Sequence, residues 1–164
     1  MNFFIILPLI KIKLEKNLKK LAGAFLVVFL LSSLGCGSKE DSLKWYSNLE
    51  QAEAVAQKEG KPIMIDFTGS DWCVWCKRLS KEVFSRDAFI SYAKENLILV
   101  KIDFPENIPQ SPETKFYNDQ LQQRFGVQGY PTIVLLNSSG AVLGVTGYQP
   151  GGAEAYVQHL KSFM

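Results

Sequence analysis

The feature of this sequence that most constrains its fold is a pair of cysteines, Cys73 and Cys76, placed where an apolar run gives way to a helical pattern. The apolar run, residues 63–67, is typical of a short buried strand. If a helix begins at Cys73, then Cys76 lies one turn further along the same face. Cysteines at this spacing can bind a metal, form a structural cross-link or carry electrons.

A metal site and a structural cross-link both fit the sequence poorly. Zinc sites usually have about four Cys or His ligands, arranged as two closely spaced pairs. Here the third cysteine, Cys36, belongs to the leader described below, and His159 is the one histidine of the chain. A bridge across two residues closes a loop too short to add much stability. We therefore expect neither a metal nor a cofactor.

Redox chemistry fits the cysteine pair better. A thiolate in the first turn of a helix is stabilised by exposed backbone N–H groups and by the positive end of the helix dipole. Its pKa therefore falls, and it becomes a nucleophile. We predict that Cys73 attacks the substrate and that Cys76 resolves the resulting mixed disulfide.

The rest of the pattern predicts an α/β domain. Apolar residues at helical spacing predict a helix that starts near residue 43 and stops at Gly60. Strands are expected at residues 63–67, 97–103, 132–136 and 141–145, and further helices at residues 80–96 with a break near Ser85, at 115–125, and from 151 through 159. Strands that alternate with helices and close on a hairpin and a helix indicate a central mixed sheet flanked by helices.

Residues 1–36 are typical of a secretory signal. Five lysines precede the uncharged stretch 21–34, which ends at a glycine and Cys36. This stretch spans only ~21 Å of a ~30 Å hydrocarbon core, which is short for a membrane anchor. Cys36 resembles the lipidated cysteine of a bacterial lipoprotein signal, although Ser33 and Leu34 depart from the usual lipobox. Plain cleavage and an uncleaved anchor are the alternatives.

The remainder of the chain is expected to be one exported domain. Residues 37–42 are polar and contain glycine, as in a short tether, and lead into a domain at residues 43–164. From residue 37 onward the chain carries 13 Lys and Arg against 15 Asp and Glu, with no basic stripe. This balance gives no reason to expect nucleic-acid binding. We expect a monomer on the periplasmic side, attached to the membrane if Cys36 is lipidated.

Two motifs in a fixed order give the sequence a specific resemblance. Asp-Trp-Cys-Val-Trp-Cys-Lys at residues 71–77 follows an expected strand, and Gly-Tyr-Pro-Thr at residues 129–132 precedes another. Together they resemble the thioredoxin family, and in particular its exported reductases of the DsbD C-terminal and DsbH types. The resemblance covers residues 43–164. It implies a thioredoxin fold and a thiol-disulfide oxidoreductase that acts on protein disulfides.

The resemblance also assigns roles to single residues. It implies that Asp66 is a buried acid that assists proton removal from Cys76. Asp66 stands seven residues before Cys73, where thioredoxins have six, so an aspartate that ends a strand near solvent is the alternative. Pro131 matches the family's cis-proline, which exposes neighbouring backbone so that an extended substrate can add as a strand. The other residues implied at the substrate site are Trp72, Trp75, Tyr130 and Thr132.

The residues around the cysteines favour a reductant. Strong oxidants stabilise their thiolate, commonly with a cation or donor between the cysteines, and Val74 and Trp75 provide neither. Asp71 is expected to oppose a thiolate, whereas Lys77 and Arg78 favour one. The periplasm is oxidising, so we expect a membrane thiol electron donor to recharge a reductase there. A disulfide oxidase or isomerase, and a non-catalytic binding module, are the alternatives.

Overall fold

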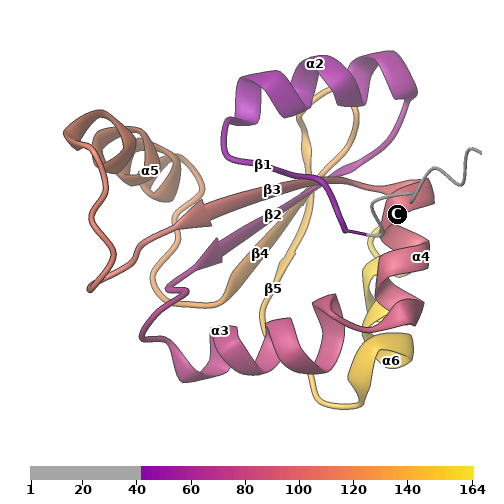
Figure 1. Ribbon diagram of the computed structural model, residues 1–164. Helices are drawn as coiled ribbons and strands as arrows, with labels where there is room; N and C mark the ends of the chain where they lie inside the picture. Colours follow the sequence, from indigo (N-terminus) through magenta and orange to yellow (C-terminus); the bar gives the residue numbers. More distant parts are fainter. Residues whose placement is uncertain (1–41) are drawn as a thin grey trace, which may run out of the picture. The chain divides into compact units, whose positions relative to one another are not determined.

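The computed structural model describes residues 42–164, which form a five-stranded mixed sheet with helices on both faces (Figure 1). The strands are β1 (Trp45–Tyr46), β2 (Ile63–Thr68), β3 (Ile98–Asp103), β4 (Thr132–Leu136) and β5 (Val142–Thr146). The helices are α2 (Leu49–Glu59), α3 (Val74–Leu79), the π-helical turn η1 (Ser80–Phe84), α4 (Asp87–Asn96), α5 (Pro112–Arg124) and α6 (Gly152–Lys161). The predicted α/β class is confirmed, whereas the leader and residues 37–41 of the expected tether lie outside the described residues.

The strand order β1-β3-β2-β4-β5 brings several loops to one end of the sheet. Strands β1, β3 and β2 are parallel, whereas β4 and β5 continue the sheet in antiparallel fashion. In this register Thr68 pairs with Asp103 and Phe67 with Thr132. Strands β2 and β3 therefore end, and β4 begins, at the same end of the sheet. The cysteines lie at this end.

The expected first helix begins later than predicted. Residues 45–46 form β1, which pairs with β3, and α2 starts only at Leu49. Asn48 sets this start because its side chain accepts a hydrogen bond from the backbone N–H of Gln51 at 2.8 Å. Helix α2 ends as predicted at Gly60, whose φ of 67° lies in the left-handed region that glycine adopts without strain.

The helical segment that follows the cysteines is broken where the sequence predicted. Helix α3 runs directly into η1, and the chain turns at Ser85 before α4 begins. The hydroxyl of Ser85 donates to the backbone carbonyl of Lys81 at 2.9 Å, which satisfies one of the carbonyl groups at the end of η1. Val83 and Phe84 remain buried through this change of direction.

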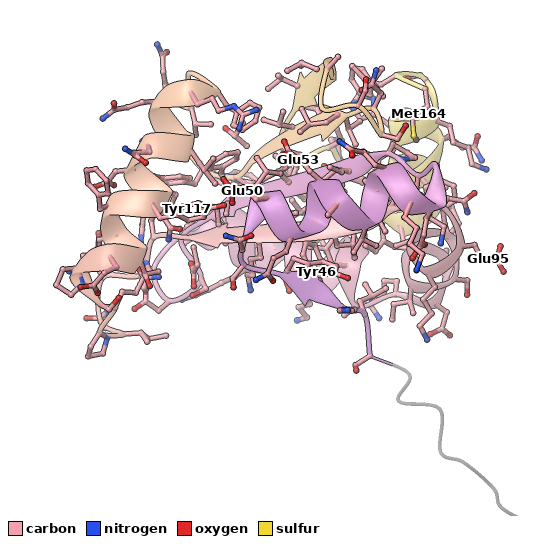
Figure 2. The ribbon with its side chains drawn as sticks, turned by 90° about the horizontal axis from the view of Figure 1, so that it is seen from above. Tyr46, Glu50, Glu53, Glu95, Tyr117 and Met164 are labelled. Atoms are coloured by element: carbon pink, nitrogen blue, oxygen red, sulfur yellow. A yellow bond between two sulfur atoms is a disulfide. The ribbon has the colours of Figure 1, made fainter. Side chains whose placement is uncertain are left out.

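Two apolar layers hold the sheet between its helices. One layer joins a face of the sheet to α3, α4 and α6, and the other joins the opposite face to α2 and α5. Tyr117 of α5 also ties the second pair of helices together (Figure 2). Its hydroxyl accepts from the backbone N–H of Leu49 at 2.6 Å and donates to Glu50 at 2.8 Å. None of the helices within residues 42–164 is both long and apolar enough to span a membrane.

Candidate active site

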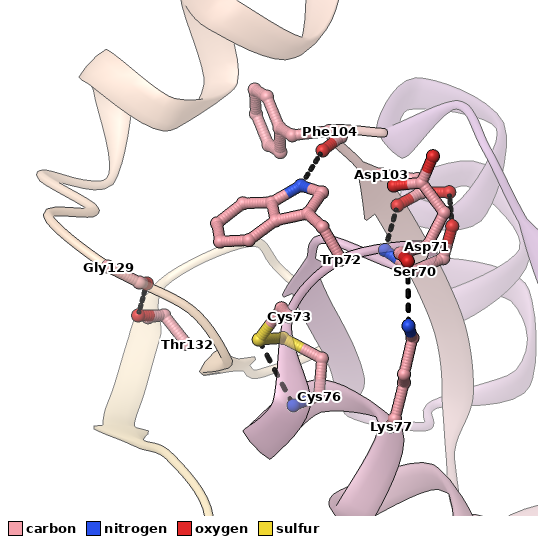
Figure 3. Close-up of a disulfide and its surroundings, with 10 residues drawn as sticks. All are labelled: Ser70, Asp71, Trp72, Cys73, Cys76, Lys77, Asp103, Phe104, Gly129 and Thr132. Atoms are coloured by element: carbon pink, nitrogen blue, oxygen red, sulfur yellow. Dashed lines mark hydrogen bonds between the residues drawn. A yellow bond between two sulfur atoms is a disulfide. The ribbon is translucent and has the colours of Figure 1, made fainter. Parts of the chain in front are cut away.

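Cys73 and Cys76 form a disulfide at the start of α3 (Figure 3). Cys73 is the N-cap residue of the helix, and its sulfur accepts a hydrogen bond from the backbone N–H of Cys76 at 3.1 Å. Both residues are 5% exposed. When the bond is reduced, a thiolate at Cys73 can use the same N–H group and the positive end of the helix dipole, which lower the pKa of a thiol at this position.

Gly69 shapes the loop that leads into the disulfide. Its carbonyl accepts from the backbone N–H of Cys73 at 2.9 Å. A Cβ at this position would lie 2.5 Å from the nearest carbon of the Trp72 indole. Any larger residue at this position would therefore force the indole to move. The loop accommodates the extra residue between Asp66 and Cys73 while β2 stays intact through Thr68.

A second loop, residues 103–108, is hydrogen-bonded to this lead-in segment. Ser70 donates to the two carboxylate oxygens of Asp103, through its backbone N–H at 2.9 Å and its hydroxyl at 2.6 Å. The Asp71 carboxylate accepts from the backbone N–H groups of residues 106–108 at 3.0, 2.6 and 3.1 Å. The Trp72 indole N–H donates to the carbonyl of Phe104 at 2.8 Å. The two loops are therefore fixed to each other beside the cysteines.

The contacts of Asp71 keep its carboxylate ionised, so its expected opposition to a thiolate at Cys73 stays a prediction. Desolvation raises the pKa of Asp71, but hydrogen bonds from the backbone of residues 106–108 outweigh this and lower the pKa below its usual value. The carboxylate is occupied by those three donors and directed at the neighbouring loop. Lys77 donates to the backbone carbonyl of Asp71 at 2.6 Å, and Arg78 pairs with Glu82 at 2.8 Å. Arg78 is therefore paired with an opposite charge, whereas Asp71 and Lys77 are hydrogen-bonded to neutral backbone groups.

Asp66 is buried in the middle of the sheet, as the resemblance implied. It is 4% exposed, so the alternative of a strand-ending aspartate near solvent is wrong. Burial raises its pKa to about 7; Lys101 acts in the opposite direction, and Asp103 adds to the rise. Its Oδ1 atom has no hydrogen-bond partner among the described residues. Because Met64 packs in the layer that contains α3, and side chains alternate along a strand, Asp66 faces α3 as well.

Trp72, next to the disulfide, contacts aromatic residues from the loops after β3 and before β4. Trp72 is 38% exposed and meets the ring of Tyr130 edge-on, with centroids 5.9 Å apart. Tyr130 in turn stacks on Phe104 at 5.1 Å. The peptide bond between Tyr130 and Pro131 is cis. Thr132 begins β4, and its hydroxyl donates to the carbonyl of Gly129 at 2.7 Å (Figure 3).

Trp75 lies in the exposed first turn of α3 and belongs to a different group. It is 51% exposed and contacts Tyr148, with ring centroids 5.2 Å apart. The guanidinium of Arg78 lies over both rings, 5.4 Å from the Trp75 centroid and 5.2 Å from that of Tyr148. The structure therefore does not gather all the predicted substrate-site residues into one contact group.

Comparison with known proteins places this geometry in a family. A model of the thioredoxin-like domain matches residues 49–163. This match covers more than half of the chain and includes both motifs. The chain belongs to the thioredoxin-like family.

Several individual members of the thioredoxin-like family are similar to this chain in sequence or structure. The disulfide bond reductase DsbH of Chlamydia pneumoniae is 36% identical over 121 residues, which are 74% of this chain and 72% of that protein. The thiol:disulfide interchange protein DsbD of Yersinia pestis is 35% identical over 120 residues, 71% of this chain but only 18% of that protein. A solved structure of a DsbH oxidoreductase superposes with a TM-score of 0.70 at 35% identity, covering 74% of this chain and 84% of that one.

These relatives and the cysteine pair together show that the chain is a thiol-disulfide oxidoreductase with a thioredoxin fold. Within residues 42–164, no cluster of three or more His, Cys, Asp or Glu side chains is placed to hold a metal ion.

Sequence reasoning missed several residues that shape this thioredoxin-like site. The hydrogen bonds of Ser70 and Asp71 depend on the position of a loop more than 30 residues away, which no local pattern reveals. Gly69 acts locally, through Trp72 and Cys73, but the position of the Trp72 indole is not readable from the sequence. The pairing of Arg78 with Glu82 carried a usable signal, because opposite charges four residues apart on a helix commonly meet. The contact of both with Tyr148 had no such signal.

Proposed function

We propose that this protein is an exported reductase of protein disulfides that works through a mixed disulfide. The observation that carries the proposal is the redox-type pair at the start of α3, in which Cys73 occupies the helix-capping position. The name of the DsbH relative, a disulfide bond reductase, supports the direction of electron flow.

The reaction transfers two electrons to the client. The Cys73 thiolate attacks one sulfur of the client disulfide, forms a bond to it, and releases the other client sulfur as a thiolate that takes a proton from water. Cys76 then loses its proton and attacks the Cys73 sulfur. This second step forms the Cys73–Cys76 disulfide and releases the remaining client thiolate. The client is reduced and the pair is oxidised.

Asp66 is proposed to accept the proton of Cys76. A carboxyl group acts best as a base when its pKa lies near the working pH, and burial raises the pKa of Asp66 to about 7. Its free Oδ1 and its position on the α3 face of the sheet support this role. Removing the proton makes Cys76 a nucleophile and so shortens the lifetime of the mixed disulfide.

The client is proposed to bind as an extended segment against the backbone before β4, at Tyr130, Pro131 and Thr132, with Trp72 and Trp75 providing apolar surface. The oxidised pair then requires a membrane thiol donor to reduce it again, because the periplasm supplies no reducing pool.

The rest of the chain is proposed to bring the domain to its place of action. Residues 1–36 are proposed to direct export, and Cys36 to carry the lipid. Residues 43–164 are proposed to act as a monomeric domain behind a short tether.

Covalent trapping tests this proposal directly. In a Cys76→Ser variant of the full-length protein, the mixed disulfide cannot be resolved, so incubation of the reduced variant with insulin should yield a complex that dithiothreitol releases. A Cys73→Ser variant serves as the matched control and should yield far less complex. Equal trapping by the two variants, or turnover of insulin by either, would contradict the assigned roles.

A further inference from the structure

Two separate aromatic groups lie beside the cysteines. One consists of Trp72, Phe104 and Tyr130, and the other of Trp75 and Tyr148. The first group joins the loop after β3 to the loop before β4, whereas Tyr148 follows β5, the next strand of the sheet. A client segment bound at the disulfide can therefore meet two aromatic surfaces.

The second group is held in place by a closed set of contacts. Glu82 accepts from Arg78 at 2.8 Å with one carboxylate oxygen and from the hydroxyl of Tyr148 at 2.7 Å with the other. The Arg78 guanidinium lies within cation–π range of both the Trp75 and Tyr148 rings. Hydrogen bonds from Tyr148 and then from Arg78 lower the pKa of Glu82, which keeps this acceptor ionised near neutral pH.

The loop that carries Tyr148 is also fixed against the substrate edge. The hydroxyl of Tyr156 donates to the carbonyl of Gly147 at 3.0 Å. A Cβ on Gly147 would lie 3.0 Å from the carbonyl oxygen of Pro131, so the two backbones approach closely. The loop that carries Tyr148 therefore lies against the backbone at Pro131, where the client is proposed to add as a strand.

We propose that Arg78, Glu82 and Tyr148 are positioning residues that hold the Trp75 indole as one wall of the substrate site. This wall selects clients that have a large apolar side chain next to a disulfide cysteine. The inference rests on the proposed function, because it needs a protein disulfide bound at Cys73.

Exposure and restraint together make Trp75 suited to recognition. An exposed tryptophan that is already held in one orientation loses little side-chain freedom when it is covered, so more of its contact energy appears as affinity. About half of the Trp75 surface is open, whereas its contacts with Tyr148 and Arg78 restrict its motion. Glu82 holds both of these partners in turn. A polar residue at the same place in the client would forgo this contact and leave the chemistry at the sulfur atoms unaffected.

Steady-state reduction of two peptide disulfides tests the inference. The peptides are identical except for Phe or Ser beside one cysteine. Tyr148→Ala should raise KM for the Phe peptide by roughly threefold to tenfold, the range expected for loss of one aromatic pair, with little change in kcat. For the Ser peptide KM should change by less than about twofold. Tyr148→Phe, which keeps the ring but loses the bond to Glu82, should fall between the wild type and Tyr148→Ala.

Two comparisons separate positioning from general damage to the fold. Tyr92→Ala removes another tyrosine from a cation–π pair, with Lys161 on α6, and should not change the preference between the peptides. Trp75→Ala should abolish the preference, and adding Tyr148→Ala to it should change nothing further, because the two residues act as one unit.

Two results would overturn the inference: an equal rise of KM for both peptides in Tyr148→Ala, or full additivity of Tyr148→Ala with Trp75→Ala. If the wild type reduces neither peptide the proposed function fails, whereas equal reduction of both refutes only the inference.

Discussion

Asp66 is a carboxyl group enclosed in an apolar layer, and this environment sets its chemistry. Burial disfavours the charged form of an acid, so its pKa rises to about 7, while the positive charge of Lys101 limits the rise. The raised pKa suits Asp66 to the proposed role of a base near neutral pH, but it also means that ionised Asp66 opposes folding. The proposed function and the stability of the fold therefore place opposite demands on this side chain.

We predict that Asp66→Asn stabilises the oxidised protein above neutral pH. The folded pKa of about 7 lies above an unfolded value of about 3.9, so the native state binds more protons than the unfolded state between these values. The free energy of unfolding should therefore fall as pH rises through this window, by up to about 4 kcal/mol. Urea unfolding of both proteins from pH 4 to pH 8 measures the difference, which should be small at pH 4 and largest at pH 8. A difference that stays constant with pH would show that the pKa is not raised.

At the scale of elements, the site is built where loops from neighbouring strands meet. Sequence patterns predicted the strand before Cys73 and the helix after it, because both follow from local periodicity. They could not predict that the lead-in to Cys73 is bound to the loop after β3, since this depends on the parallel pairing of Thr68 with Asp103. The start of α2 was misplaced for a related reason: residues 45–46 have helical spacing, but pairing with β3 holds them as a strand.

We predict that Asp71→Asn loosens the loop after β3. An amide group has one accepting oxygen where the carboxylate has two, so it cannot accept from all three backbone N–H groups of residues 106–108. Amide hydrogen exchange in the oxidised protein should become several-fold faster at one or more of residues 106–108, because at least one of these N–H groups loses its acceptor. Glu106→Gln is the matched control, because it removes one negative charge from the same loop and leaves the Asp71 carboxylate in place. Unchanged protection in Asp71→Asn would show that these bonds do not hold the loop.

At the scale of the whole molecule, the direction of electron flow depends on how much the fold stabilises the Cys73 thiolate. The residues between the cysteines, Val74 and Trp75, bring no charge, and the sequence alone shows this. The sequence could not show the contacts of the surrounding charged residues: Asp71, Lys77 and Arg78 each have hydrogen-bond partners other than the disulfide. The stabilisation that remains comes from the start of α3 and from one backbone N–H, which a thioredoxin-like fold provides in any case.

The reduction potential of the pair should therefore lie much nearer to thioredoxin, at ~−270 mV, than to the oxidant DsbA, at ~−120 mV. For a two-electron couple this gap corresponds to about 7 kcal/mol. One exposed charge contributes about 1 kcal/mol or less, equivalent to roughly 20 mV, so no single side chain at the surface can move the pair across it. Equilibration of the full-length protein with graded glutathione ratios, followed by trapping of the thiols, measures the potential. Lys77→Ala and Asp71→Asn, measured in parallel, should each shift it by no more than about 20 mV. A wild-type value above about −180 mV, the level of disulfide isomerase, would assign the protein to oxidation or isomerisation, because a pair at that potential holds its electrons too tightly to reduce most protein disulfides.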